Sequence, residues 1–168
     1  MFRDGHFEET ASGSKEAVAE FTGEIHGHVR FIYSEKSRST RIKVDVEGLQ
    51  DGQKYNYHIH EKPVTNNDCS TTGEHFNPTK APYPQERGKY FESYEVGDVS
   101  GKFGPMVPEN GGKFRNWEPY YDPTMTVGEE GSNRDILGRS VVIHASSSID
   151  RAPNDTIFGV TRHFANSN

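Results

Sequence analysis

A two-residue alternation of apolar and polar side chains constrains the fold of this chain more than any other feature of its sequence. The alternation runs through residues 17–22 and is clearest in residues 40–46, where Ile42, Val44 and Val46 are separated by charged residues. Side chains two positions apart lie on the same face of a strand, so such a segment buries one face and exposes the other. The pattern therefore predicts β-strands rather than amphipathic helices.

Turn-forming residues separate the alternating segments. The 168-residue chain contains 17 glycines and 9 prolines, and only 31% of its residues are hydrophobic. Such a composition favours turns and long loops, most clearly in residues 62–94 and 104–123. Together these features predict an all-β sandwich or barrel of about eight short strands joined by long loops. The expected strands cover residues 17–22, 25–33, 40–46, 54–61, 95–99, 124–127, 140–145 and 156–164.

The domain organisation and the charge limit the classes of partner. Residues 1–15 are small and polar without periodicity and predict a flexible lead-in, while residues 16–168 form one domain. A net charge of -6 without a basic run argues against nucleic acid. No apolar stretch approaches the roughly 20 residues that a membrane helix needs. The start of the chain lacks the apolar core of a signal peptide, which fits a cytosolic protein or a domain excised from a longer one.

Histidine spacing is the main candidate for chemistry. His58 and His60 are two residues apart in an expected strand, so both rings lie on one face, where they can bind one metal ion. His26 and His28 have the same spacing, so this spacing alone does not distinguish a metal site from histidines without a ligand. The alternative interpretation of either pair is two half-exposed strand histidines without a ligand.

Two further histidines lie in informative surroundings. His75 is part of the sequence GEHFNP at 73–78, and His144 ends the apolar run 141–143. A histidine within an apolar strand is costly to bury unless it is coordinated or hydrogen-bonded. A neutral core histidine bonded to a carbonyl group is the alternative interpretation for His144.

Four motifs in this order resemble the copper/zinc superoxide dismutase family: HIHE at 58–61, GEHFNP at 73–78, GDVSG at 97–101 and GRSVVIH at 138–144. The resemblance covers about residues 17–160. It implies an eight-stranded Greek-key β-sandwich, the architecture of this enzyme class. It also implies that four histidines bind copper, namely His58, His60, His75 and His144.

The departures from the family pattern indicate its copper-only branch. No histidine occurs between His75 and His144, and Glu95 stands where a zinc histidine is expected. The resemblance therefore implies copper without zinc. Glu95 is expected to accept a hydrogen bond from His75 and so fix its ring. Asp98 is expected to order the same region from further out.

Other departures concern the loop after His144 and the cysteine. Only the short segment 145–155 separates His144 from the last expected strand, and Arg151 is its only cation. By the resemblance, Arg151 helps to draw superoxide to the metal; the alternative is a solvated loop charge. Cys69 matches a family cysteine that pairs with a second one near the last strand, but the chain has no other cysteine.

The function implied by the resemblance is superoxide dismutase activity, which disproportionates superoxide to O2 and hydrogen peroxide. Imidazole ligands suit both oxidation states of copper. His75 would release the copper ion and take up a proton when the copper is reduced. The copper-only branch implies an extracellular location. The alternative function is a copper-binding or purely structural module without turnover.

Overall fold

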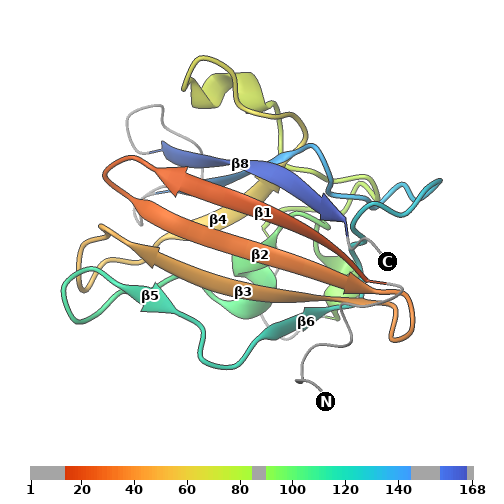
Figure 1. Ribbon diagram of the computed structural model, residues 1–168, viewed down its shortest axis with the longest axis horizontal. Helices are drawn as coiled ribbons and strands as arrows, with labels where there is room; N and C mark the ends of the chain where they lie inside the picture. Colours follow the sequence, from red (N-terminus) through yellow and green to blue (C-terminus); the bar gives the residue numbers. More distant parts are fainter. Residues whose placement is uncertain (1–13, 85–89, 145–155, 166–168) are drawn as a thin grey trace.

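The computed structural model describes residues 14–84, 90–144 and 156–165, and the predicted all-β class is confirmed (Figure 1). No helix in this described part is long and apolar enough to cross a membrane. The elements are β1 (Ser14–Thr22), β2 (His26–Ser34), β3 (Ser39–Glu47), β4 (Asn56–His60), η2 (Cys69–Thr72), η3 (Phe91–Ser93), α1 (Val99–Phe103), β5 (Phe114–Arg115), β6 (Tyr120–Asp122), β7 (Ser140–His144) and β8 (Thr156–Ala165).

The strands form one antiparallel sheet that folds back on itself. Its order is β4-β7-β8-β1-β2-β3-β5, and β6 pairs with β3 beside β5. In Figure 1 the strands β1, β2 and β3 form the front layer, and β4 passes behind them. The chain thus crosses from β3, next to β5 at one end of the sheet, to β4 at the other end. The last strand, β8, returns beside β1, a Greek-key type of connection.

The core lies between the two layers and follows the alternation seen in the sequence. Ile42, Val44 and Val46 of β3 are fully buried, and the residues between them are partly exposed. Tyr57 and Ile59 of β4 are also buried, as is every residue of β7. Because β4 and β7 pair inside this core, the histidines on them are removed from water.

Two expected strands are wrong. Residues 95–99 form a turn that leads into α1, because the Asp98 carboxylate caps that helix by accepting a hydrogen bond from Gly101 N at 2.8 Å. Residues 124–127 form no strand; Thr126 makes a single bridge with Asp135. At the N-terminus, β1 begins at Ser14, two residues ahead of the expected domain start.

A buried ion pair fixes α1 to the rest of the domain. The side chains of Lys102 and Asp122 have no exposed surface, and Lys102 Nζ lies 2.7 Å from Asp122 Oδ2. Lys102 Nζ also donates to Thr124 Oγ1 at 2.8 Å and to the Val96 carbonyl at 3.0 Å. All three ammonium donors are therefore used, one of them on the turn that precedes α1.

Candidate metal centre

Four histidines from three parts of the chain converge behind the front layer. His58 and His60 come from β4, His144 ends β7, and His75 lies in the loop beside β4, where it forms a bridge with His60. Each ring offers one nitrogen, and these four atoms all lie within 4.8 Å of one another. The structure thus brings together the set expected from the sequence. Within the described residues it is the one group of three or more potential metal ligands.

In three of the four rings, one nitrogen contacts a surrounding group. His60 Nδ1 lies 3.0 Å from the Gly73 carbonyl. His75 Nδ1 lies 2.7 Å from Glu95 Oε1, the contact expected from the sequence. His58 Nε2 lies 3.1 Å from the Tyr83 hydroxyl. Such contacts fix the tautomer and orientation of a ligand ring and leave its second nitrogen to face the metal.

One backbone position joins the two segments that carry His58, His60 and His75. Gly97 O accepts a hydrogen bond from Ile59 N at 2.8 Å, and Gly97 N donates to Phe76 O at 2.9 Å. Phe76 N in turn donates to Ile59 O at 2.7 Å. A Cβ at position 97 would overlap the Ile59 carbonyl oxygen, so this close approach requires glycine. The turn that supplies Glu95 is therefore held against both ligand segments.

Asp98, from the same turn, lies beside His58 of the cluster. Its Oδ1 is 3.6 Å from His58 Nε2, and its side chain is almost fully buried. Burial is the main cause that raises the pKa of this carboxyl to about 6, and its hydrogen bond from Gly101 N opposes that rise. Glu95 and Asp98 thus place two carboxylates behind two rings of the cluster.

Burial and neighbouring rings lower the pKa of His58 and so favour its neutral imidazole, the form that binds metal. His58, His60 and His144 are buried, whereas the His75 side chain is 16% exposed. Desolvation, followed by the proximity of His75, His144 and His60, holds the pKa of His58 well below its ordinary value. The buried His58 Nδ1 has no hydrogen-bond partner among the described residues. Four converging imidazoles are a donor set that copper accepts, so the residues fit a copper ion.

Sequence reasoning missed Tyr83. Its ring lies edge-on to His75, with centroids 4.7 Å apart, and to His58, with centroids 5.4 Å apart. Tyr83 lies in a proline-rich loop without periodicity, so nothing in its local sequence connects it to the cluster.

The remaining candidates lie elsewhere or outside the described residues. His26 and His28 lie on β2, in the front layer, and take no part in the cluster. Arg151 falls in 145–155, outside the described residues. Cys69 begins η2 and is partly exposed; because the sequence has one cysteine, no disulfide forms within the chain.

Comparison with known proteins agrees with this geometry. The Cell surface Cu-only superoxide dismutase 5 of Candida albicans is 32% identical over 143 residues, which cover 82% of this chain and 58% of that protein. The Extracellular superoxide dismutase (Cu-Zn) of Drosophila melanogaster is 32% identical over 122 residues, which cover 72% of this chain and 60% of that protein. The chain therefore spans about three fifths of the length of these curated relatives.

Structural similarity extends over nearly the whole chain. The Cu(II) structure of Candida albicans superoxide dismutase 5 has a TM-score of 0.75 and 28% identity, and the match covers 92% of this chain and 95% of that one. The family model described as copper/zinc superoxide dismutase (SODC) matches residues 25–156, which include all four clustered histidines. The chain belongs to the copper/zinc superoxide dismutase family.

Proposed function

We propose that the chain binds one copper ion and no zinc through His58, His60, His75 and His144, and that it disproportionates superoxide to O2 and hydrogen peroxide. The observation that carries this proposal is the four-histidine cluster with Glu95 bonded to His75 Nδ1. A nitrogen held in that hydrogen bond is not available to a second metal, which supports the zinc-free part. The name of the Candida relative supports it as well.

A bound copper ion would supply the electron transfer of this reaction, because imidazole ligands suit both of its oxidation states. His75 is the member of the cluster with appreciable exposure, so its Nε2 can exchange a proton with water when that atom is not bound to copper. Glu95 orients that ring through its contact with His75 Nδ1 at 2.7 Å. His75 thus holds and passes a proton that peroxide formation consumes.

The rings of His58 and His60 are held rather than mobile in this proposal. His60 is fixed by the Gly73 carbonyl, and His58 by Tyr83 and Asp98. The names of the Candida and Drosophila relatives, one cell-surface and one extracellular, support an extracellular location for this chain.

Metal analysis tests the proposal. Purified protein loaded with copper and dialysed is expected to hold about one copper per chain, with zinc well below stoichiometric, because four imidazoles form one closed donor set. Superoxide removal by this sample in the presence of EDTA measures the activity of bound copper. A stoichiometric zinc that survives dialysis contradicts the copper-only proposal. Full copper loading without catalysis contradicts the enzymatic one and favours the binding module.

Tyr83→Phe tests the support of His58. The change keeps the ring beside His58 and His75 but removes the hydroxyl 3.1 Å from His58 Nε2. A hydrogen bond contributes about 0.5–1.5 kcal/mol, so copper affinity is expected to fall roughly two- to tenfold. Chelator competition measures the affinity, and electron paramagnetic resonance reports the altered ligand field. Tyr90→Phe is the control, because Tyr90 is 82% exposed; equal affinities in both variants would contradict the role of Tyr83.

A further inference from the structure

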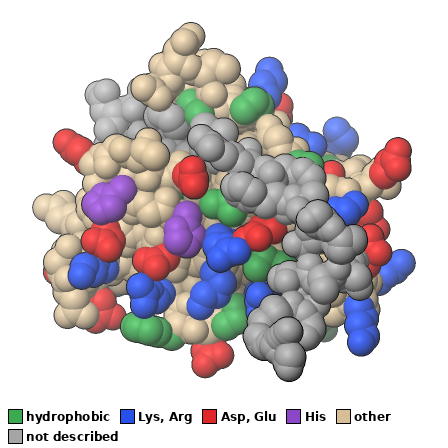
Figure 2. Space-filling view, in the orientation of Figure 1, with side chains coloured by type: hydrophobic (Ala, Val, Ile, Leu, Met, Phe, Trp, Pro, Cys, Tyr) green, Lys and Arg blue, Asp and Glu red, His purple; other side chains and the backbone are tan. Residues whose placement is uncertain are grey.

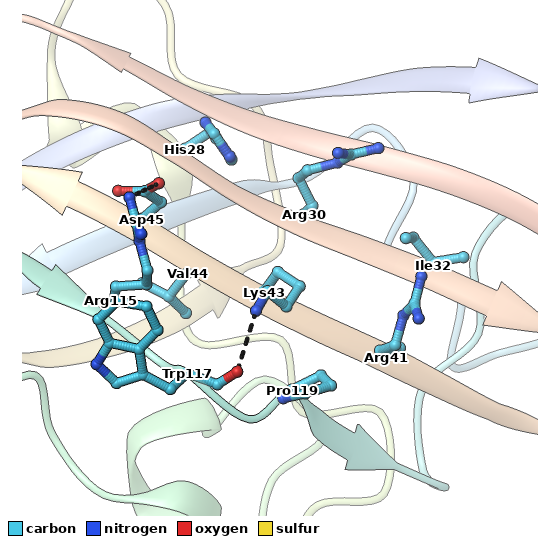
Figure 3. A pocket seen from close by; sticks show the side chains of 10 residues that line it. All are labelled: His28, Arg30, Ile32, Arg41, Lys43, Val44, Asp45, Arg115, Trp117 and Pro119. Carbon is cyan, nitrogen blue, oxygen red and sulfur yellow. Dashed lines mark hydrogen bonds and ion pairs between the residues drawn. The ribbon is translucent and has the colours of Figure 1, made fainter. Parts of the chain in front are cut away.

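A groove of about 570 Å³ lies on the outward face of the front layer (Figure 3). None of the residues that line it belongs to the histidine cluster. Its floor is formed by outward side chains of β2 and β3, and its side by residues 115–119. Small-molecule sites commonly have volumes of roughly 300–1,000 Å³. The groove is thus large enough for a ligand of that class.

The charge of this groove has the opposite sign to that of the chain. Four cationic residues line it against a single carboxylate, Asp45, although the whole chain carries a net charge of -6. The cationic residues are Arg30, Arg41, Lys43 and Arg115. Figure 2 shows Lys and Arg side chains gathered, among acidic ones, over this face. Because charges more than about 8 Å away are largely screened at physiological ionic strength, a ligand in the groove senses mainly these four cations and the two carboxylates paired with them, Glu16 and Asp45.

The register of the strands places like charges together. Arg30 of β2 lies directly opposite Lys43 of β3 on the exposed face, an arrangement that destabilises a sheet. Glu16 pairs with Arg30, and Asp45 pairs with Arg115 at 3.1 Å. Lys43 Nζ donates to the carbonyl of Asn116 at 3.2 Å, which does not neutralise its charge. A bound anion would offset the repulsion between Arg30 and Lys43.

An exposed aromatic ring lies at the edge of the same groove. Trp117 is the only tryptophan of the chain, and it is 79% exposed. The Arg115 guanidinium lies 5.1 Å from the centre of the Trp117 ring, which orients the indole beside the cations (Figure 3). Exposed tryptophan next to arginine is typical of the residues that dominate binding energy. The flat indole offers a packing surface for a ring, and the neighbouring cations offer contacts for its anionic groups.

We propose that this groove binds an acidic oligosaccharide, in which sugar rings carry sulfate or carboxylate groups. The C–H face of one sugar ring packs on Trp117. Its anionic groups contact Arg30, Arg41 and Lys43. Binding there leaves the histidine cluster accessible, so the protein can be retained on an acidic glycan while its metal site stays open to a small substrate.

Tryptophan fluorescence tests the proposal directly, since the single Trp117 lies in the groove. A heparin-derived octasaccharide and a hexamer of galacturonate serve as sulfated and carboxylated probes for the copper-loaded protein. At least one of them is expected to give a saturable change in emission that weakens as salt rises. Maltohexaose, a neutral chain, is expected to bind roughly tenfold more weakly or not at all, because it lacks charge-assisted contacts.

The double variant Arg41→Gln, Lys43→Gln is expected to weaken binding of the acidic probe by roughly tenfold or more. The matched control, Lys36→Gln with Lys54→Gln, removes the same charge from exposed positions outside the groove and should leave the affinity unchanged. Melting temperature and copper content show whether each variant is folded. If the double variant is not folded, Trp117→Ala tests the groove by calorimetry, with the same expected loss.

Three results would overturn the proposal. The first is no binding of either acidic probe by fluorescence and calorimetry. The second is equal loss of affinity in the groove variant and the matched control. The third is equal affinity for a single-stranded oligonucleotide of the same charge, which would show that the groove does not select a sugar.

Discussion

Lys102→Met is expected to lower the free energy of unfolding by about 3–5 kcal/mol, because removing one partner of a buried ion pair leaves the other charge without compensation. Lys102 and Asp122 have fully buried side chains, and their charged atoms are 2.7 Å apart. The substitution also removes the bond to the Val96 carbonyl, which holds the turn before α1. Urea denaturation followed by circular dichroism measures the loss.

Two further variants separate charge from packing. Lys102→Met combined with Asp122→Leu replaces the pair by apolar groups and should recover a large part of the lost stability. Arg115→Met breaks the exposed pair with Asp45, where the expected loss is at most about 1 kcal/mol. A loss in Lys102→Met as small as that in Arg115→Met would show that the buried pair does not hold α1.

Glu95→Gln is expected to slow turnover by roughly 10- to 100-fold while copper stays bound, since groups that orient ligands have effects of this size. The variant keeps the shape of the side chain but removes the charge 2.7 Å from His75 Nδ1. The half-reaction that consumes protons should slow more than the other, because His75 then loses the charged hydrogen-bond partner that orients its ring for proton transfer. Pulse radiolysis measures the two half-reactions separately, and elemental analysis measures copper.

Glu92→Gln is the matched control, since Glu92 lies exposed on η3, three residues away, and carries the same charge. It should retain full activity. The role of Glu95 is contradicted if Glu95→Gln keeps the full rate, or if it loses copper as readily as His75→Ala. In the second case Glu95 would stabilise the metal site rather than assist proton transfer through His75.

The sequence predicted β1, β2 and β3 closely because their signal is local. Each has alternating side chains, and an exposed and a buried face follow from that spacing alone. The four clustered histidines were predicted from motifs, since two of them share a strand and the others lie in motifs typical of the family.

The turn at residues 95–98 could not be predicted in the same way. Val96 and Val99 made the segment look like a strand, yet contacts with distant residues decide its shape. Gly97 bonds to Ile59 and Phe76, and Lys102 holds the Val96 carbonyl. Such tertiary contacts override local propensity. The same reason explains why Tyr83, in an irregular loop, was missed.

The pairing of β4 with β7 also has a consequence for the time course of folding. His58, His60 and His75 are synthesised close together, whereas His144 arrives much later and takes its place only when β7 pairs with β4. Contacts between distant parts of a chain form late, because closing a long loop costs entropy before the contact stabilises it. A nascent chain that ends before β7 therefore has three of the four rings and an incomplete donor set. High-affinity copper binding would therefore appear only when β7 has paired with β4. In ribosome-bound fragments of increasing length, copper affinity should rise in one step once the chain includes β7.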